Sequence, residues 1–247
     1  MMYEKCDNEI LRQLKARKSV RIFTDQPIGE AEKAAILTAA VHAPSAGNQQ
    51  LYTILDITDP QLKAQLAESC DHQPFIATAP LVLVFVADVR RWIDLYDAAG
   101  ALHREPGVGD LMLAVSDTNI AAQNAVAAAW SLGIGSCYIG DIMENCETQK
   151  KLLNLPPLVF PAAMLVFGYP TEQQKDRTKP PRCPMNTIVQ ENGYHIRDGA
   201  ELRRMTEKDW HSSSFEAWVQ RFCERKYNSG FSREMSRSVE EYLKEYR

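Results

Sequence analysis

The sequence lacks the common motifs of metal and nucleotide binding. Its five histidines form no HxxxH pair and its six cysteines form no CxxC pair, so neither residue type offers the ligand spacing of a zinc site. No GKS or GKT element is present, and the glycines at 133, 135 and 140 fail the GxGxxG pattern because Tyr138 occupies the third glycine place. These absences exclude a P-loop and a dinucleotide-binding fingerprint, and we predict no metal site.

Long apolar runs are also scarce. The most apolar stretch, residues 111–133, contains polar residues that would be costly in lipid without partners, namely Asp117, Asn119, Gln123 and Asn124. The residues MMYEKCDNEI have no apolar signal core, and the scattered cysteines are typical of a reducing compartment. We therefore expect no transmembrane segment and a cytoplasmic location.

Positive charge is unevenly distributed along the chain. In a protein of net charge −4, residues 11–21 contain no acid and five basic residues around Ser19, which are Arg12, Lys15, Arg17, Lys18 and Arg21. Because the chain as a whole is acidic, nucleic acid is an unsuitable partner. A single phosphate group on a small molecule fits this local concentration better.

A second basic cluster lies in the segment KDRTKPPRCP, directly after the last predicted core strand. Its members are Lys175, Arg177, Lys179 and Arg182. The prolines exclude a regular helix there. Each cluster by itself is more often a solvated surface, but two clusters in loops or at element ends could converge on one phosphate.

Helical and strand patterns alternate up to about residue 170, which indicates layers of α and β structure. We predict helices at 8–18, 29–42, 59–68 and 110–132, and strands at 51–58, 79–88, 134–140 and 161–170. The first helix would direct Ile10, Leu11 and Leu14 inward. The next segment, SVRIF, is expected to be extended, so Ser19 and Arg21 would share one face. The apolar run from residue 79 predicts a strand buried on both faces, in the centre of the sheet.

Two features of the core leave room for alternatives. Ser116, Asn119 and Gln123 form a polar stripe on the 110–132 helix, which suits either a partly solvated edge or a dimer seam. Cys137 could be imagined as a nucleophile, but we interpret it as a small core residue. At 247 residues with 45% hydrophobic content, one compact domain and an intertwined oligomer both remain open.

The character of the chain changes after residue 170. Residues 183–213 are polar and without periodicity, whereas two later sets of residues recur with helical spacing. The first set is Phe215, Trp218, Val219, Phe222 and Cys223, and the second is Phe231, Met235, Val239 and Tyr242. An aromatic face beyond a polar connector must be buried by something, and another subunit is a natural candidate.

Four motifs together resemble the FMN-dependent nitroreductase family. They are RKSVR at 17–21, APSAGNQQ at 43–50, GIGSCYIG at 133–140 and KPPR at 179–182, and the resemblance covers residues 10–184. It implies an α+β fold of three α/β/α layers with a mainly antiparallel central sheet, and an intertwined homodimer with FMN at the subunit interface. It also divides the chain into an FMN-binding domain at 1–184 and a C-terminal tail at 185–247 whose amphipathic helices pack on the partner subunit.

The resemblance assigns cofactor contacts residue by residue. It gives Arg17, Lys18, Ser19, Lys179 and Arg182 to the FMN phosphate, with Arg182 the better match because a second proline offsets Lys179. Arg21 would reach the ribityl chain or the pyrimidine edge, where positive charge stabilises reduced flavin. Ser45, Asn48 and Gln50 would meet the ring and ribityl chain, although Leu51 and Tyr52 replace the usual Pro and Trp. Ile139 and Gly140 match the strand end that offers a backbone N–H to flavin N5.

The resemblance implies an NADH- or NADPH-dependent oxidoreductase that works by ping-pong hydride transfer through the flavin to nitroaromatics, quinones or similar electron-poor acceptors. No side chain is assigned as catalytic. The alternatives are flavin reduction, dehalogenation or dehydrogenation within the same superfamily, with residues 92–109 and the tail covering the substrate. A non-catalytic FMN-binding protein and a protein that binds another phosphorylated metabolite are two further alternatives.

Overall fold

The computed structural model describes residues 7–208 and 214–246. It divides into two units. The first unit runs up to Arg177 and resumes at Glu234, and the second is Thr178–Arg233. This division differs from the expected boundary at 184/185, because the end of the chain belongs with the first unit and not with the tail.

A four-stranded sheet forms the centre of the first unit. Its strands are β1 (Tyr52–Asp56), β2 (Leu81–Asp88), β3 (Gly135–Ile139) and β4 (Val159–Gly168), in the order β1-β2-β4-β3. All three neighbouring pairs are antiparallel, which confirms the fold class. Every residue of β2 is buried and this strand lies inside the sheet, as its apolar run predicts.

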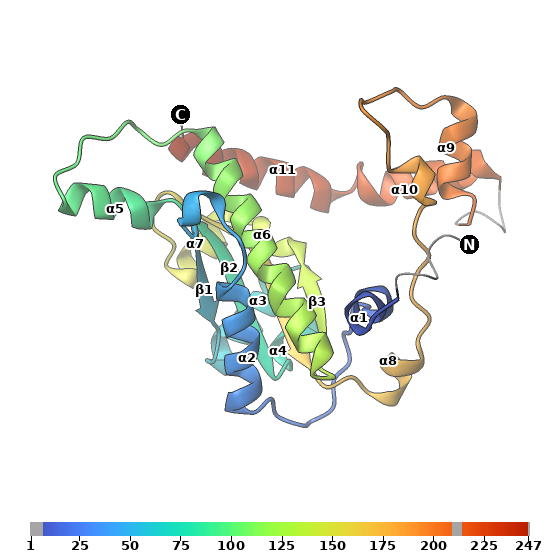
Figure 1. Cartoon of the computed structure of the whole chain (residues 1–247), viewed down its shortest axis with the longest axis horizontal. Helices are drawn as coiled ribbons and strands as arrows, with labels where there is room; N and C mark the ends of the chain where they lie inside the picture. The colour runs from blue at the N-terminus through green and yellow to red at the C-terminus, as the bar shows by residue number, and fades with distance from the viewer. Residues whose placement is uncertain (1–6, 209–213, 247) are drawn as a thin grey trace. The chain divides into compact units, whose positions relative to one another are not determined.

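Helices cover both faces of this sheet and complete the three layers. On one face lie α2 (Glu30–Val41) and α6 (Val108–Ser131), side by side, and on the other lie α3 (Pro60–Ser69), α4 (Pro74–Ala77) and α7 (Cys146–Leu153) (Figure 1). Alternate residues of β2 supply the two cores, because successive side chains of a strand point to opposite faces. Leu83 and Phe85 belong to the first core, Val82 and Val84 to the second.

Helix ends follow their local sequence. The Asp59 side chain accepts a hydrogen bond from the Gln61 N–H, and Pro60 occupies the first turn of α3, where a missing N–H costs nothing. In α1 (Glu9–Ala16) the Asn8 side chain caps the Leu11 N–H.

Two local predictions need correction. In the described chain Ile10 of α1 is 71% exposed and Leu14 is 48% exposed, because both line an open hollow between α1 and α6 and not a packed core. Lys175 is helical, since α8 (Glu172–Asp176) ends just before the prolines that were expected to break the whole segment.

The remaining elements are short. The first unit contains η1 (Ala46–Asn48), α5 (Arg90–Ala98) and η2 (Gly140–Met143), and the second contains η3 (Met185–Thr187), α9 (Gly199–Thr206) and α10 (Phe215–Lys226). The chain ends with α11 (Gly230–Leu243) and η4 (Lys244–Tyr246). Among residues 7–208 and 214–246 no helix has the length and apolar character needed to cross a bilayer.

The last helix was expected to bury its aromatic face on another subunit, but part of that face is covered by its own chain. Tyr242 is fully buried and Tyr246 nearly so, in a core cluster that also contains Phe160. The ring of Phe160 meets that of Tyr242 edge-on, with centroids 5.0 Å apart. The end of α11 is therefore a structural part of the first unit.

Candidate anion and flavin site

The basic segment after α1 lies along the free edge of β3. Ser19 forms a parallel bridge with Ser136, and the Val20 N–H donates to the Ser136 carbonyl at 2.9 Å. Gly135 permits this approach, because a Cβ at that position would lie 2.6 Å from the Val20 side chain. Gly135, which is not part of a nucleotide-binding pattern, is therefore needed for close packing of the backbone.

Three residues of this segment influence the thiol of Cys137 on β3. Burial raises the pKa of the Cys137 thiol, while the charge of Arg21, a hydrogen bond with Ser19 and the charge of Arg17 lower it. Arg17 also acts on the neighbouring Tyr138, whose pKa burial raises to about 12. The segment therefore brings two guanidinium groups and one hydroxyl to the edge of β3, a set that suits a phosphate or another anion. Cys137 itself is buried, as its interpretation as a core residue requires.

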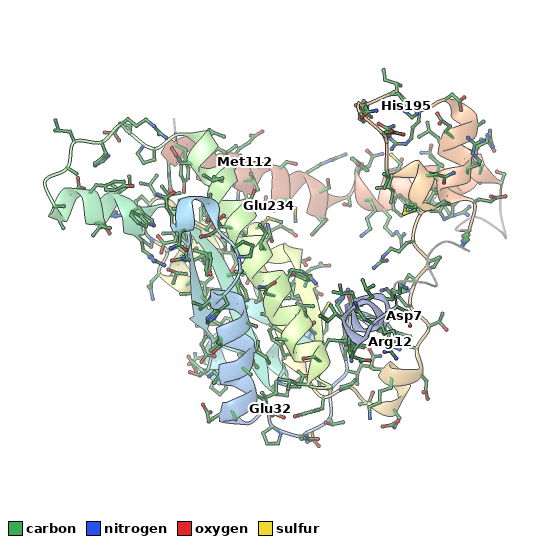
Figure 2. All side chains as sticks on the ribbon, in the orientation of Figure 1. Asp7, Arg12, Glu32, Met112, His195 and Glu234 are labelled. Atoms are coloured by element: carbon green, nitrogen blue, oxygen red, sulfur yellow. The ribbon has the colours of Figure 1, made fainter. Side chains whose placement is uncertain are left out.

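Lys18 has different surroundings. Its ammonium donates to the carbonyls of Lys175 and Arg177, each at 2.5 Å. The guanidinium of Arg177 in turn donates to the Ser19 carbonyl. On the outer surface of α1, Arg12 forms an ion pair with Asp7 at 3.7 Å (Figure 2), so this member of the basic run is engaged in a surface pair.

The loop of residues 45–51 is held in a strained conformation by a buried carboxylate. Gly47, Asn48 and Gln50 have φ values of 56°, 57° and 45°, in the left-handed region that most residues avoid. Asp117 of α6 accepts from the Ala46 N–H at 3.0 Å and from the Leu51 N–H at 3.4 Å.

Side chains within this loop are also paired. The Gln50 amide donates to the Asn48 side chain at 2.7 Å, and the Gln50 N–H donates to the Ser45 hydroxyl at 3.1 Å. From α5, the indole N–H of Trp92 donates to the Gln49 carbonyl at 2.8 Å. The three predicted loop residues therefore form one preorganised unit supported from two helices.

The end of β3 offers an open backbone position. Ile139 is buried, whereas Gly140, the first residue of η2, is exposed. Apart from Gly140, its chain neighbours and the backbone of η2, no heavy atom of the described residues lies within 4 Å of the place that a Cβ on Gly140 would take. A flat ring could approach the backbone there without displacing a side chain.

Hollows lie beside these groups, and the two described next are the larger ones. One, of about 540 Å³, is lined by Ile10, Leu14 and Arg17 on the α1 side and by residues of α6 such as Asn124 and Trp130. The other, of about 420 Å³, lies between α5, the loop after it and α6, and its lining includes Gln49, Trp92 and Tyr96.

The predicted residues fall into separate groups. Arg17, Ser19 and Arg21 gather at β3, with Ile139 and Gly140 on the same strand and its end; Ser45, Asn48 and Gln50 gather on the loop supported by α6. Lys179 and Arg182 belong to the second unit.

Two supporting residues escaped the sequence reasoning. Asp117 had been noted only as a polar residue in an apolar helix, and that buried position was its signal. Gln174 is buried and accepts from the Arg21 N–H at 3.3 Å, and nothing in its local sequence marks this role.

An antiparallel sheet between two helical layers, with a cationic segment along its edge strand, defines an α+β protein with a positively charged sheet edge. The chain belongs to the nitroreductase family, whose model matches residues 14–169.

Relatives of known function support this placement. The chain is 30% identical over 239 residues to an FMN reductase [NAD(P)H] of Bacillus subtilis, covering 95% of this chain and 91% of the relative. It is 36% identical over 192 residues to an oxygen-insensitive NADPH nitroreductase of Salmonella typhimurium, covering 77% of each.

Solved structures agree with the fold. A nitroreductase from B. subtilis is 25% identical and superposes with a TM-score of 0.81, over 96% of this chain and 98% of the other. The NADPH:FMN oxidoreductase of Vibrio harveyi, complexed with NAD+, has the same fold with a TM-score of 0.81 at 23% identity, over 96% of this chain and 98% of that chain.

Proposed function

We propose that this protein is an FMN-dependent NAD(P)H oxidoreductase of the nitroreductase type. The observation that carries the proposal is the pairing of the basic segment 17–21, with Arg17, Ser19 and Arg21, against β3, a strand that ends at the open position of Gly140. This donor set suits FMN, since guanidinium groups grip phosphate oxygens in pairs and an accessible backbone accommodates a flat ring.

The proposed contacts follow from these positions. Arg17 and Ser19 hold the phosphate, and Arg21 places positive charge near the polar edge of the ring system. The loop amides of Asn48 and Gln50 contact ring and ribityl atoms, and the backbone at Ile139 and Gly140 lies against the central ring. Lys179 and Arg182 are assigned to the phosphate by the family motif alone.

FMN, when bound, accepts hydride from a nicotinamide and passes reducing equivalents to an oxidised acceptor. The protein's own residues bind, orient and shield the cofactor. Asp117 keeps the 45–51 loop in its strained form, so the loop need not reorganise when the cofactor binds. We assign no acid, base or nucleophile, and we infer quinones and nitroaromatics as acceptors because they are planar and electron-poor.

We also infer a homodimer and a reducing compartment such as the cytoplasm. Apolar side chains of α6 that are partly exposed in the single chain, such as Met112 and Ile120, support the dimer. The five cysteines among the described residues are all free thiols, which supports the compartment.

The experiment that tests the proposal is an anaerobic titration of the purified protein, reconstituted with FMN, against NADH and then NADPH. We expect the flavin absorbance to bleach with at least one donor and to recover when a quinone is added. Bound FMN that stays oxidised with both donors would favour a flavin-binding protein without this activity, and failure to bind FMN would overturn the proposal.

The phosphate assignment is tested by replacing Arg17 and Arg182 with alanine, singly and together. Each lost charge-assisted contact is worth about 1.5–3 kcal/mol, so we expect FMN affinity to fall about tenfold or more for each ligand. Fluorescence of free flavin measures the change, and circular dichroism checks that the variants fold. Stoichiometric FMN in the double variant would contradict the assignment.

A further inference from the structure

We propose that Lys18 is a positioning residue and not a phosphate ligand: together with Arg177 it forms a reciprocal clasp that holds residues 17–21 against β3. This inference rests on the proposed FMN site. It assigns Lys18 a role different from that implied by the family motif, in which it stands between two phosphate-binding residues.

The first argument is the direction of the side chains. Lys18 lines a small hollow together with Val20 of the same segment and with Gln174 and Lys175. Alternate residues of an extended segment face opposite ways. Lys18 is therefore directed to the side of Val20, away from Ser19.

The second argument is the occupation of the ammonium group. A lysine has three N–H donors, and two of those of Lys18 are used by the carbonyls of Lys175 and Arg177. Both carbonyls lie at the C-terminal end of α8, where backbone carbonyls lack helical partners and a positive charge is favourable. Binding a phosphate through this group would require breaking these bonds.

The third argument is reciprocity. Arg177 donates back to the Ser19 carbonyl, and the buried Gln174 accepts from the Arg21 N–H. The bonds therefore run in both directions between the 18–21 segment and the 174–177 segment. Loss of either Lys18 or Arg177 would loosen the same contact.

Backbone hydrogen bonds extend the contact between the 18–21 and 174–177 segments toward residues 22–24 and 169–171. The Thr24 N–H donates to the Tyr169 carbonyl at 2.8 Å, and the Thr171 N–H donates to the Ile22 carbonyl at 3.4 Å. Phe23 bridges Pro170, and Gly168 makes room for it, because a Cβ there would lie 2.6 Å from the Phe23 ring. The clasp therefore closes the end of a paired stretch that runs from residue 18 to residue 24.

The test compares the variants K18M, R177M and the double variant with R17M and with R12M. The R12M variant is the matched control. It removes one charge from the same basic run, residues 11–21, but among the described contacts it breaks only the surface ion pairs of Arg12 with Asp7 and Glu9. For each protein the dissociation constants of FMN and of riboflavin are measured by flavin fluorescence. Riboflavin lacks the phosphate, so the ratio of the two constants reports phosphate recognition alone.

We expect R17M to reduce the riboflavin-to-FMN ratio about tenfold or more, as loss of a charge-assisted bond requires. K18M should raise both constants and leave their ratio within about twofold of the wild-type value. The double variant K18M/R177M should bind FMN no more weakly than the weaker single variant, because both substitutions open one clasp. A ratio that collapses in K18M as it does in R17M would overturn the proposal.

A second readout does not depend on flavin. In the cofactor-free protein, hydrogen exchange at the amides of Arg21, Thr24 and Thr171 should accelerate in K18M and R177M and stay unchanged in R12M. Unchanged exchange in K18M would overturn the clasp even if FMN binds. The two proposals can fail separately. If the wild-type protein binds neither FMN nor riboflavin, the proposed function is refuted. Accelerated exchange in K18M and R177M would then still support the clasp.

Discussion

At the scale of single residues, two buried carboxylates of the first unit have opposite surroundings. Asp117 receives two backbone N–H groups from the loop that it supports. Glu144, at the end of η2, is also buried, and its Oε1 atom has no hydrogen-bond partner among the described residues. Burial, together with the nearby carboxylates of Asp141, Asp71 and Glu234, raises the pKa of Glu144 to about 7.

This raised pKa predicts a specific dependence of stability on pH. The folded protein holds the proton of Glu144 more tightly than the unfolded chain does, so this stabilising contribution is full below about pH 4 and is lost as the pH rises through 7. We expect E144Q, which cannot ionise, to be more stable than the wild type at pH 8, by about 1–3 kcal/mol. Denaturant unfolding of both proteins at pH 5 and pH 8 measures the difference in unfolding free energy between E144Q and the wild type. If this difference is the same at both pH values, the prediction is wrong.

At the scale of elements, α11 is attached to the first unit by ion pairs and by one buried aromatic ring. The guanidinium of Arg237 forms a bidentate pair with the carboxylate of Glu147 of α7, with two hydrogen bonds of 2.9 Å. Lys150 forms an ion pair with Glu245. Below these surface pairs, the ring of Tyr242 packs against Phe160, and its hydroxyl reaches the Cys146 carbonyl at 3.5 Å. Exposed ion pairs contribute little, so the buried aromatic ring is the main anchor.

Removing that ring should destabilise the first unit itself. We expect Y242A to lose about 3–5 kcal/mol of unfolding free energy, because truncating a buried aromatic side chain leaves a cavity. The matched control Y242F keeps the ring and loses only a long hydrogen bond, so its cost should stay below about 1.5 kcal/mol. Chemical denaturation followed by circular dichroism compares them. If Y242A and Y242F have the same stability, the ring is not an anchor.

At the scale of the whole molecule, a face of α6 is left uncovered by the described residues of its own unit. Met112 projects from this helix (Figure 2), and Val108, Leu113 and Ile120 are also partly exposed. The polar stripe of Ser116 and Asn119 bonds back to helix carbonyls, so it needs no further partner. An apolar face with self-satisfied polar groups suits the proposed dimer.

We expect M112E to weaken the dimer at least tenfold, because dimerisation would bury an unpaired carboxylate. Sedimentation velocity over a range of protein concentrations measures the shift. The control is L102E, since Leu102 is fully exposed in the loop after α5. A dimer that is equally stable in both variants would show that α6 is not part of the interface.

The local sequence determined most of the elements of this protein. The apolar run of β2, the Asp59–Pro60 start of α3 and the helical spacing of residues in α6, α10 and α11 all predicted the structures found, because caps and periodicity act over a few residues. The strand direction and the cofactor came from the family motifs, because periodicity does not report which strands pair.

Tertiary structure decided which residues act together. Residues 18 and 177 meet only because a glycine in each of β3 and β4 lets the 17–24 segment lie against the sheet. Asp117 reaches the 45–51 loop because α6 packs beside α2. The covering of Tyr242 by its own chain also depends on where α11 lies. Contacts between residues far apart in sequence leave no local pattern, and the physical reason is that each of them is set by the packing of whole elements.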